Sequence, residues 1–136
     1  MDRSLFTYEV SHSDNLISFH CLQDVDEIRL KDNLTACFHE EPNAYGFDWL
    51  LDFSPVSQAL SAANIKDIGR AWQRMAKGRD VGKRTAYITL DPLMRERVLI
   101  PSASLPYRTI RAFERLDEAH TWLRTLRDDD RGVQPI

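Results

Sequence analysis

The chain has 136 residues, of which 43% are hydrophobic and 29% are charged, a composition typical of one soluble globular domain. It contains no run near the ~18 apolar residues that span a bilayer, and its start, MDRSLFTYEV, lacks the long apolar stretch of a signal peptide. Its two cysteines, Cys21 and Cys37, are too few for a disulfide framework. We therefore expect a cytoplasmic protein.

The net charge of -3 conceals an asymmetry between the halves of the chain. Residues 1–68 hold 12 acidic and 4 basic side chains, whereas residues 69–136 hold 9 acidic and 14 basic ones. The densest basic positions are Arg70, Arg74, Lys77, Arg79, Lys83 and Arg84. A surface for phosphate, an acidic partner or nucleic acid is one interpretation, but the cation-rich end of a helix is the simpler one. The sequence pI of about 5.8 argues against a nucleic-acid binder.

Two short strands are predicted at the start of the chain, over 6–10 and 16–22, because apolar and polar residues alternate there. The residues between them, His12-Ser13-Asp14-Asn15, have turn chemistry, so we expect an antiparallel hairpin. The second strand would place Ile17, Phe19 and Cys21 on one face and Leu16, Ser18, His20 and Leu22 on the other.

A helix should follow the hairpin, with Asp24 as N-cap and Glu27 completing an acidic capping box. It should end near Glu41, because Pro42 disfavours helix in the preceding residue. Its predicted core positions are Ile28, Leu30, Leu34, Cys37 and Phe38. The next segment, 47–53, is too apolar for a strand exposed on one face and is predicted to be a central strand.

The clearest helix is predicted over 63–77, after an irregular connection over 54–61. Either Asn64 or Ser61 would cap its start, and Gly78 would take the left-handed conformation at its end. The remaining predicted elements are a strand over 84–90, a short helix after Asp91-Pro92 and a strand over 107–113. A last helix follows, with Leu116, Ala119, Leu123 and Leu126 on its apolar stripe.

The order of these elements, β-β-α-β-α-β-(α)-β-α, predicts an α/β fold. We expect a mixed sheet of about five strands, with an N-terminal antiparallel hairpin and about four helices covering it. Residues 1–127 should form a single domain and residues 128–136 a polar C-terminal tail.

Four short motifs resemble the SpoIIAA-like family, part of the STAS and SEC14-like group. They are Tyr8-Glu9-Val10, Leu50-Leu51-Asp52, Arg111-Ala112-Phe113 and Glu118-Ala119-His120-Thr121-Trp122-Leu123. The likeness covers residues 6–126. It implies a single SpoIIAA-like (STAS-like) domain and a regulatory or protein-binding role, and the SEC14-like relationship implies a possible small apolar ligand or lipid.

The chain departs from this family at the segment after the central strand. Family members that act as phosphorylation switches carry an Asp-Ser-[Ser/Thr]-Gly motif there, whereas this chain has Ser-Pro-Val-Ser-Gln-Ala-Leu-Ser-Ala-Ala over 54–63. Ser57 and Ser61 are the candidate phosphorylation sites near that place, and a helix N-terminus would favour a phosphate. The competing interpretation is that one serine caps the helix and the others satisfy the loop.

Other candidate chemistry is weak. His39-Glu40-Glu41 lacks the second histidine of a zinc-protease helix, so no metal or cofactor is expected. Asp48 and Asp52 share a strand face and could act as paired carboxylates, but an aspartate at the end of a strand more often binds the next loop. Asp52 is the candidate to test, because open α/β sheets bind ligands beyond the carboxyl ends of their strands. The two cysteines and the three tryptophans are predicted to pack in the core.

The sequence thus predicts a non-enzymatic regulatory or protein-interaction module with a protein partner. The alternative is a small-molecule or lipid-binding domain with a pocket between sheet and helices. A third hypothesis, an enzyme that uses Asp52 and the adjacent serines, has the least support. A homodimer through a sheet edge is possible.

Overall fold

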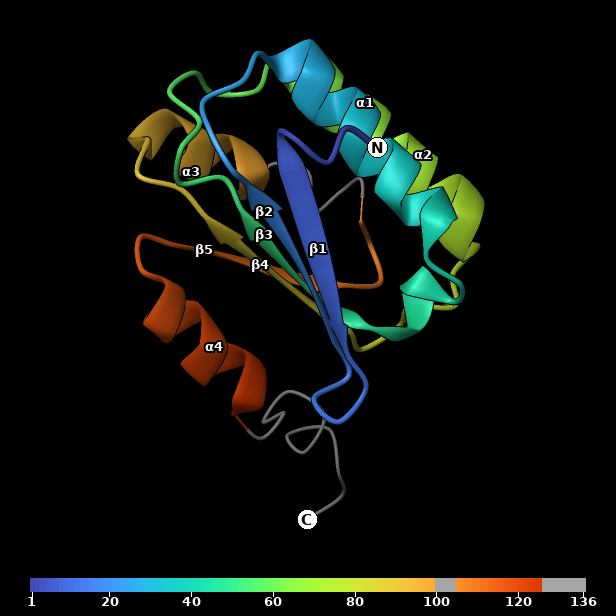
Figure 1. Cartoon of the computed structure of the whole chain (residues 1–136). Helices are drawn as coiled ribbons and strands as arrows, with labels where there is room; N and C mark the ends of the chain where they lie inside the picture. The colour runs from blue at the N-terminus through green and yellow to red at the C-terminus, as the bar shows by residue number, and fades with distance from the viewer. Residues whose placement is uncertain (100–104, 126–136) are drawn as a thin grey trace.

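A five-stranded mixed sheet with helices on both faces forms the centre of the protein in the computed structural model, which describes residues 1–99 and 105–125 (Figure 1). The elements in chain order are β1 (Phe6–Ser11), β2 (Leu16–Cys21), α1 (Glu27–Glu40), the short 3₁₀ helix η1 (Ala44–Gly46), β3 (Asp48–Asp52), α2 (Ala62–Ala76), β4 (Arg84–Ile88), α3 (Pro92–Leu99), β5 (Thr109–Phe113) and α4 (Leu116–Arg124). The predicted α/β fold is confirmed.

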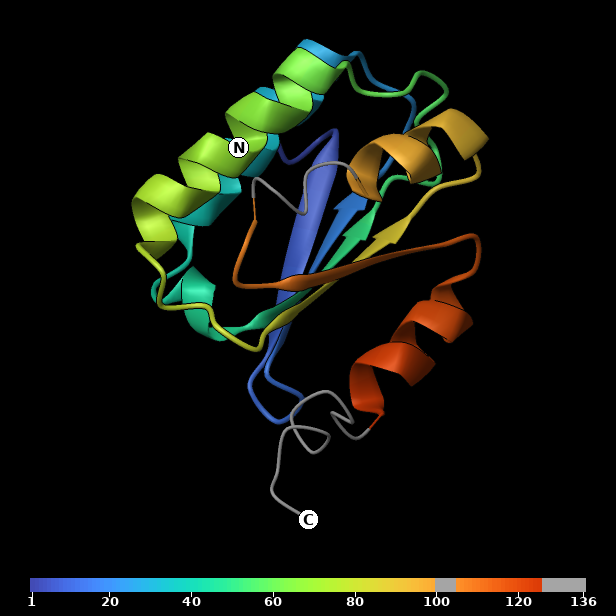
Figure 2. The same ribbon diagram turned by 180° about the vertical axis from the view of Figure 1, so that it is seen from behind.

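The strands lie in the order β1-β2-β3-β4-β5, so each strand pairs with its neighbours in the chain. β1 and β2 form the predicted antiparallel hairpin, and β2 to β5 are parallel. Right-handed crossovers that always advance in one direction place their helices on one face of a sheet. α1, α2 and α3 accordingly cover one face, whereas α4 folds back onto the other (Figure 2).

The central strand β3 is buried on both faces, which explains its continuous apolar sequence. Trp49 and Leu51 face α1 and α2, where Trp49 meets Phe38 and Trp72 edge to face at ring-centroid distances of 5.4 and 5.7 Å. Leu50 points to the smaller core under α4. Its other members are Leu16, Ala86, Ile88, Ala119 and Leu123.

A buried ion pair fastens the amino edge of the sheet, the edge at which β2 to β5 begin. Arg108 Nε lies 2.9 Å from Asp80 Oδ2, and both side chains are almost fully buried. Arg108 makes five hydrogen bonds, one for each of its N–H donors. The acceptors are the Asp80 carboxylate, the Thr85 hydroxyl and the main-chain carbonyls of Tyr45, Phe47 and Arg84. Burial lowers the pKa of Arg108 to about 10, so it stays charged at neutral pH.

The residues that cap the starts of α1 and α2 are not those that the sequence first suggested. α1 is capped by Asp26, whose carboxylate accepts a hydrogen bond from the Arg29 amide, so the prediction of Asp24 was wrong. α2 is capped by Ser61, the alternative to Asn64. At its end, Lys77 and Gly78 both take the left-handed conformation that was predicted for Gly78 alone.

Three apolar residues are more exposed than their pattern predicts. Ile28 on α1 and Leu116 on α4 are 52% and 42% exposed, so their assignment to the core was wrong. Trp122 is only partly buried, and the guanidinium carbons of Arg84 and Arg111 lie 5.0 and 5.6 Å from its ring centroid. Leu126 and the predicted tail over 128–136 lie outside the described residues. Of the helices that the structure describes, none is long and apolar enough to cross a bilayer.

Candidate functional site

The candidate site lies at the carboxyl edge of the sheet, where β2 to β5 end and the connections to the helices begin (Figure 1). The parallel register places His20 beside Asp52. His20 Nδ1 lies 3.1 Å from Asp52 Oδ2, and the two side chains are 26% and 17% exposed. On its other oxygen, Asp52 accepts hydrogen bonds from the amide and hydroxyl of Ser54 at 3.0 and 2.7 Å.

These bonds change the acidity of both partners. Burial alone would raise the pKa of Asp52, but hydrogen bonds from His20 and Ser54 hold that pKa below its usual value. The bond to Asp52 raises the pKa of His20 against the opposing effect of burial. The pair is therefore an ion pair at mildly acidic pH.

Two further carboxylates hold the connection between β3 and α2. Asp24 accepts hydrogen bonds from the amide and hydroxyl of Ser57 at 2.9 and 2.5 Å, and these bonds lower the pKa of Asp24. Glu27 accepts from the Ser61 amide at 2.8 Å and from the Asn64 side chain at 2.6 Å. The three serines of the connection thus each meet a carboxylate: Asp52 for Ser54, Asp24 for Ser57 and Glu27 for Ser61.

This arrangement bears on the catalytic hypothesis for Asp52. In a Ser–His–acid triad the serine bonds to the histidine, which the acid orients. Here Ser54 and His20 bind different oxygens of the same carboxylate, so Asp52 lies between them. Asp48 is at the other end of β3, about 13 Å away at the rise of an extended strand, so the two aspartates are not paired. Asp52 binds the start of the next loop, the commoner role of such an aspartate.

The same contacts define what a phosphate at Ser57 or Ser61 would meet. The Ser61 hydroxyl already accepts the capping hydrogen bond from the Asn64 amide at 3.2 Å. The amide of Ser61 donates to the Glu27 carboxylate. The Ser57 hydroxyl is bonded to Asp24. A phosphoryl group at either serine would face a carboxylate of like charge. Both serines remain candidates by position.

The carboxyl edge also exposes large apolar side chains. Seven such residues are exposed in the described part of the chain, and five of them follow β2, β4 or β5 at this edge. They are Leu22, Ile28, Leu90, Leu93 and Leu116, with exposed fractions of 53%, 52%, 64%, 46% and 42%. The other two, Val81 and Tyr107, lie at the amino edge. We call the five residues the apolar rim.

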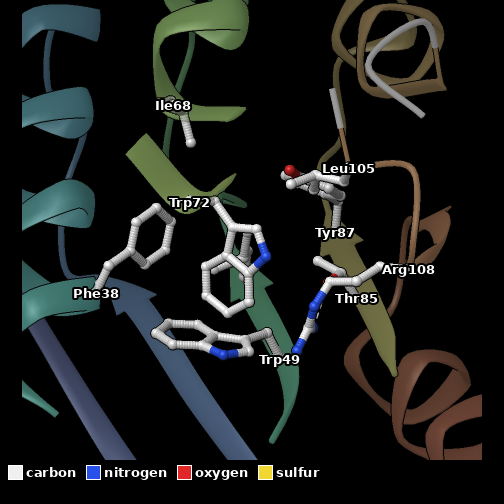
Figure 3. A pocket seen from close by; sticks show the side chains of 9 residues that line it. Phe38, Trp49, Ile68, Trp72, Thr85, Tyr87, Leu105 and Arg108 are labelled. Atoms are coloured by element: carbon white, nitrogen blue, oxygen red, sulfur yellow. Dashed lines mark hydrogen bonds between the residues drawn. The ribbon is translucent and has the colours of Figure 1, made fainter. Parts of the chain in front are cut away.

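The space between the sheet and helices α1 and α2 is nearly filled. Phe38, Trp49 and Trp72 pack against one another there, next to Tyr87 and Leu105 (Figure 3). The remaining cavities have volumes of about 20 and 10 Å³, room for about one water molecule each. A lipid does not fit in this space as the structure stands.

The other candidate groups lie apart from the site. Cys21 and Cys37 are buried, and burial raises the pKa of both thiols to about 12, as suits core residues. His12, His39 and His120 lie in a turn, on α1 and on α4. Within the described ranges, no group of three or more histidines, cysteines and carboxylates could hold a metal ion.

Part of the basic segment stabilises helix ends. Arg79 donates to the carbonyls of Met75 and Ala76 at the end of α2, and Arg84 donates to the carbonyls of Trp122 and Thr125 at the end of α4. Positive charge at these ends complements the helix dipole. Arg70 lies 3.6 Å from Asp67 on the same helix. Arg79 therefore fits the interpretation of a cation-rich helix end, whereas Arg84 lies on β4 and binds the end of a different helix, α4.

Sequence reasoning missed the His20–Asp52 contact and the Arg108–Asp80 pair. The first had a usable signal, because both residues stand near the ends of predicted strands, and parallel pairing of those strands would have brought them together. The second had none, because Asp80 stands in a loop 28 residues from Arg108.

No known family model matches the chain, and no curated protein matches it. Among solved structures, the chain is similar to the crystal structure of an uncharacterised protein from the DUF3478 family with a SpoIIAA-like fold, from Shewanella loihica PV-4. The two are 21% identical, the match covers 87% of this chain and 91% of that chain, and the TM-score is 0.47. The SpoIIAA-like fold named for that structure is the one that the four sequence motifs of this chain resemble.

Proposed function

We propose that this protein is a non-enzymatic, cytoplasmic regulatory module that binds a protein partner at the carboxyl edge of its sheet. The observation that carries the proposal is the apolar rim. Five large apolar side chains are exposed in the segments that follow β2, β4 and β5, beside polar groups that can hydrogen-bond. Apolar patches rimmed by polar residues are typical of protein–protein contact sites.

The polar part of the surface suits recognition better than bond cleavage. Ser54, Ser57 and Ser61 are each bonded to a carboxylate, which fixes the shape of the connection between the apolar residues. A surface of fixed shape binds a partner at a lower entropic cost than a flexible one. The small cavities under α1 and α2 do not favour the lipid-binding alternative.

The test compares two surface variants of the full chain. L90E/L116E places two charges on the apolar rim, and V81E places one on the opposite edge, where Val81 is 68% exposed. Each protein is used for quantitative cross-linking and capture in its native cells, after thermal unfolding shows equal stability. We expect a partner that wild type and V81E recover and L90E/L116E loses. The same captured set with all three proteins, or background alone, would overturn the proposal.

A further inference from the structure

A separate pocket opens at the amino edge, between the end of α2 and the residues that precede β5. Its volume is about 220 Å³. It is lined by Trp72, Gly78, Asp80, Leu105, Pro106 and Tyr107, among others, and we call it the Asp80 pocket. Clefts for drug-sized ligands have volumes of about 300–1,000 Å³, so this pocket suits a molecule of one or two rings.

Aromatic and apolar side chains form the walls of the Asp80 pocket. Trp72 is buried, and Tyr107 is 51% exposed. The Tyr107 ring packs against Gly78, where a Cβ atom would lie 3.6 Å from Tyr107 Cε2. Gly78 has a φ of +76°, a left-handed conformation that favours glycine at this position beside the ring. Walls of this kind favour a planar aromatic ligand by stacking and edge contacts.

Asp80 supplies the acidic group of the pocket, whose lining also includes Gln73 and Lys77. Its Oδ2 accepts hydrogen bonds from Trp72 Nε1 at 2.6 Å and from Arg108 Nε at 2.9 Å. Its Oδ1 accepts none from residues 1–99 and 105–125, so this oxygen is the acceptor left for a ligand. Because Arg108 already balances the charge of Asp80, the pocket requires a hydrogen-bond donor and not a second cation.

We propose that the Asp80 pocket binds a small, neutral, planar aromatic molecule that donates an N–H or O–H hydrogen bond to Asp80 Oδ1. The site lies at the opposite edge of the sheet from the apolar rim, and the proposal is independent of the proposed function. Its chemistry differs from that of a lipid site, because the pocket is small, has aromatic walls and contains a carboxylate.

The test is an NMR titration of the ¹⁵N-labelled full chain with indole and with 1-methylindole, which has nearly the same shape but no N–H donor. We expect saturable shifts of the Trp72 Nε1–H and Gly78 amide signals with indole. A hydrogen bond to a charged group contributes enough for 1-methylindole to bind about tenfold more weakly. No saturable shift with indole, or equal affinity for the two compounds, would overturn the proposal.

Two variants locate the binding. Y107A removes one wall and should weaken indole binding about fivefold. V81A removes an exposed apolar side chain at the same edge, outside the lining of the pocket, and should leave the affinity unchanged. Unchanged affinity in Y107A, or an equal loss in V81A, would refute binding in the Asp80 pocket.

Discussion

The two edges of the sheet are held together in different ways. At the amino edge, Arg108 and Asp80 are buried, and one guanidinium group joins the starts of β3, β4 and β5 through five hydrogen bonds. At the carboxyl edge, carboxylates hold the β3–α2 connection through partly or fully exposed serines. A buried hydrogen-bond network contributes more to stability than exposed hydrogen bonds, which compete with bonds to water. The amino edge therefore depends on a buried network for its stability, whereas the proposed protein partner would meet the more weakly held contacts of the carboxyl edge.

The largest expected effect tests the buried network. R108M removes the cation and leaves the Asp80 carboxylate in the interior with one remaining donor, Trp72 Nε1. Breaking such a pair destabilises a protein by about 3–5 kcal/mol. Urea unfolding measures the change. R115M, which breaks the exposed pair with Asp117, is the matched control and should unfold like wild type. A loss below about 1 kcal/mol in R108M would show that the amino edge does not depend on this pair.

A smaller effect is expected at the start of α2. S61A removes the hydroxyl that caps the helix, and loss of a serine cap costs about 1 kcal/mol. S57A removes an exposed hydroxyl bonded to Asp24 and should cost less. Thermal unfolding of the two variants side by side gives the order. An equal or larger loss in S57A would mean that the loop contact, and not the cap, holds the connection.

At the carboxyl edge, the contribution of the His20–Asp52 pair to stability should depend on pH. The raised pKa of His20 adds stability below its ordinary value of 6.5, and this stability is lost as pH rises through the raised pKa. The lowered pKa of Asp52 adds stability above its ordinary value of 3.8, and this is lost as pH falls. The pair therefore contributes most between about pH 4 and 6.5.

H20Q tests this window. At pH 5.5 the wild type should be more stable than H20Q by about 0.5–1 kcal/mol in unfolding free energy, and this difference should be smaller at pH 8. Urea unfolding at both pH values measures it. A difference that is independent of pH would show that His20 acts by packing and not by charge.

The smallest effect is expected at the apolar rim. L90S should change the unfolding free energy by less than about 0.5 kcal/mol, because Leu90 is 64% exposed. L50A, at a fully buried position of β3, should cost about 2–5 kcal/mol. A loss of similar size in L90S would mean that the rim serves the fold, and the contrast between the two edges would fail.

The pattern of the sequence predicts the fold well because periodicity reports burial directly. The two-sided burial of β3 follows from its unbroken apolar run, and the hairpin follows from the alternation around its turn. The helix caps were harder to predict, because each helix start offers two residues that can cap it. These are Asp24 and Asp26 for α1, and Ser61 and Asn64 for α2. The local sequence does not decide between them. Asp24 was wrong because its carboxylate bonds to Ser57, 33 residues away.

The candidate site was only partly predictable. The hydrogen bonds between Asp52 and the next loop were expected, but its bond to His20 depends on how β2 and β3 pair. Ile28 and Leu116 were expected in the core but are exposed. Helical spacing identifies an apolar stripe, but it does not show whether other elements cover each residue of that stripe. The Asp80 pocket could not be predicted, because it forms between the turn after α2 and the residues before β5. These segments are far apart in the sequence, so no local pattern indicates that they meet.

The strand order has a consequence for how the chain reaches its fold. Because every strand pairs with its neighbours in sequence, the β1–β2 hairpin closes a short loop and each parallel pairing closes a loop of about 25 to 36 residues across a helical connection. Loop closure costs more entropy as the loop lengthens, so the hairpin is the easiest pairing of the sheet to form. Synthesis delivers the hairpin first and then each strand with its helix. The sheet can therefore grow one strand at a time as the chain leaves the ribosome, each new unit adding to an edge already in place.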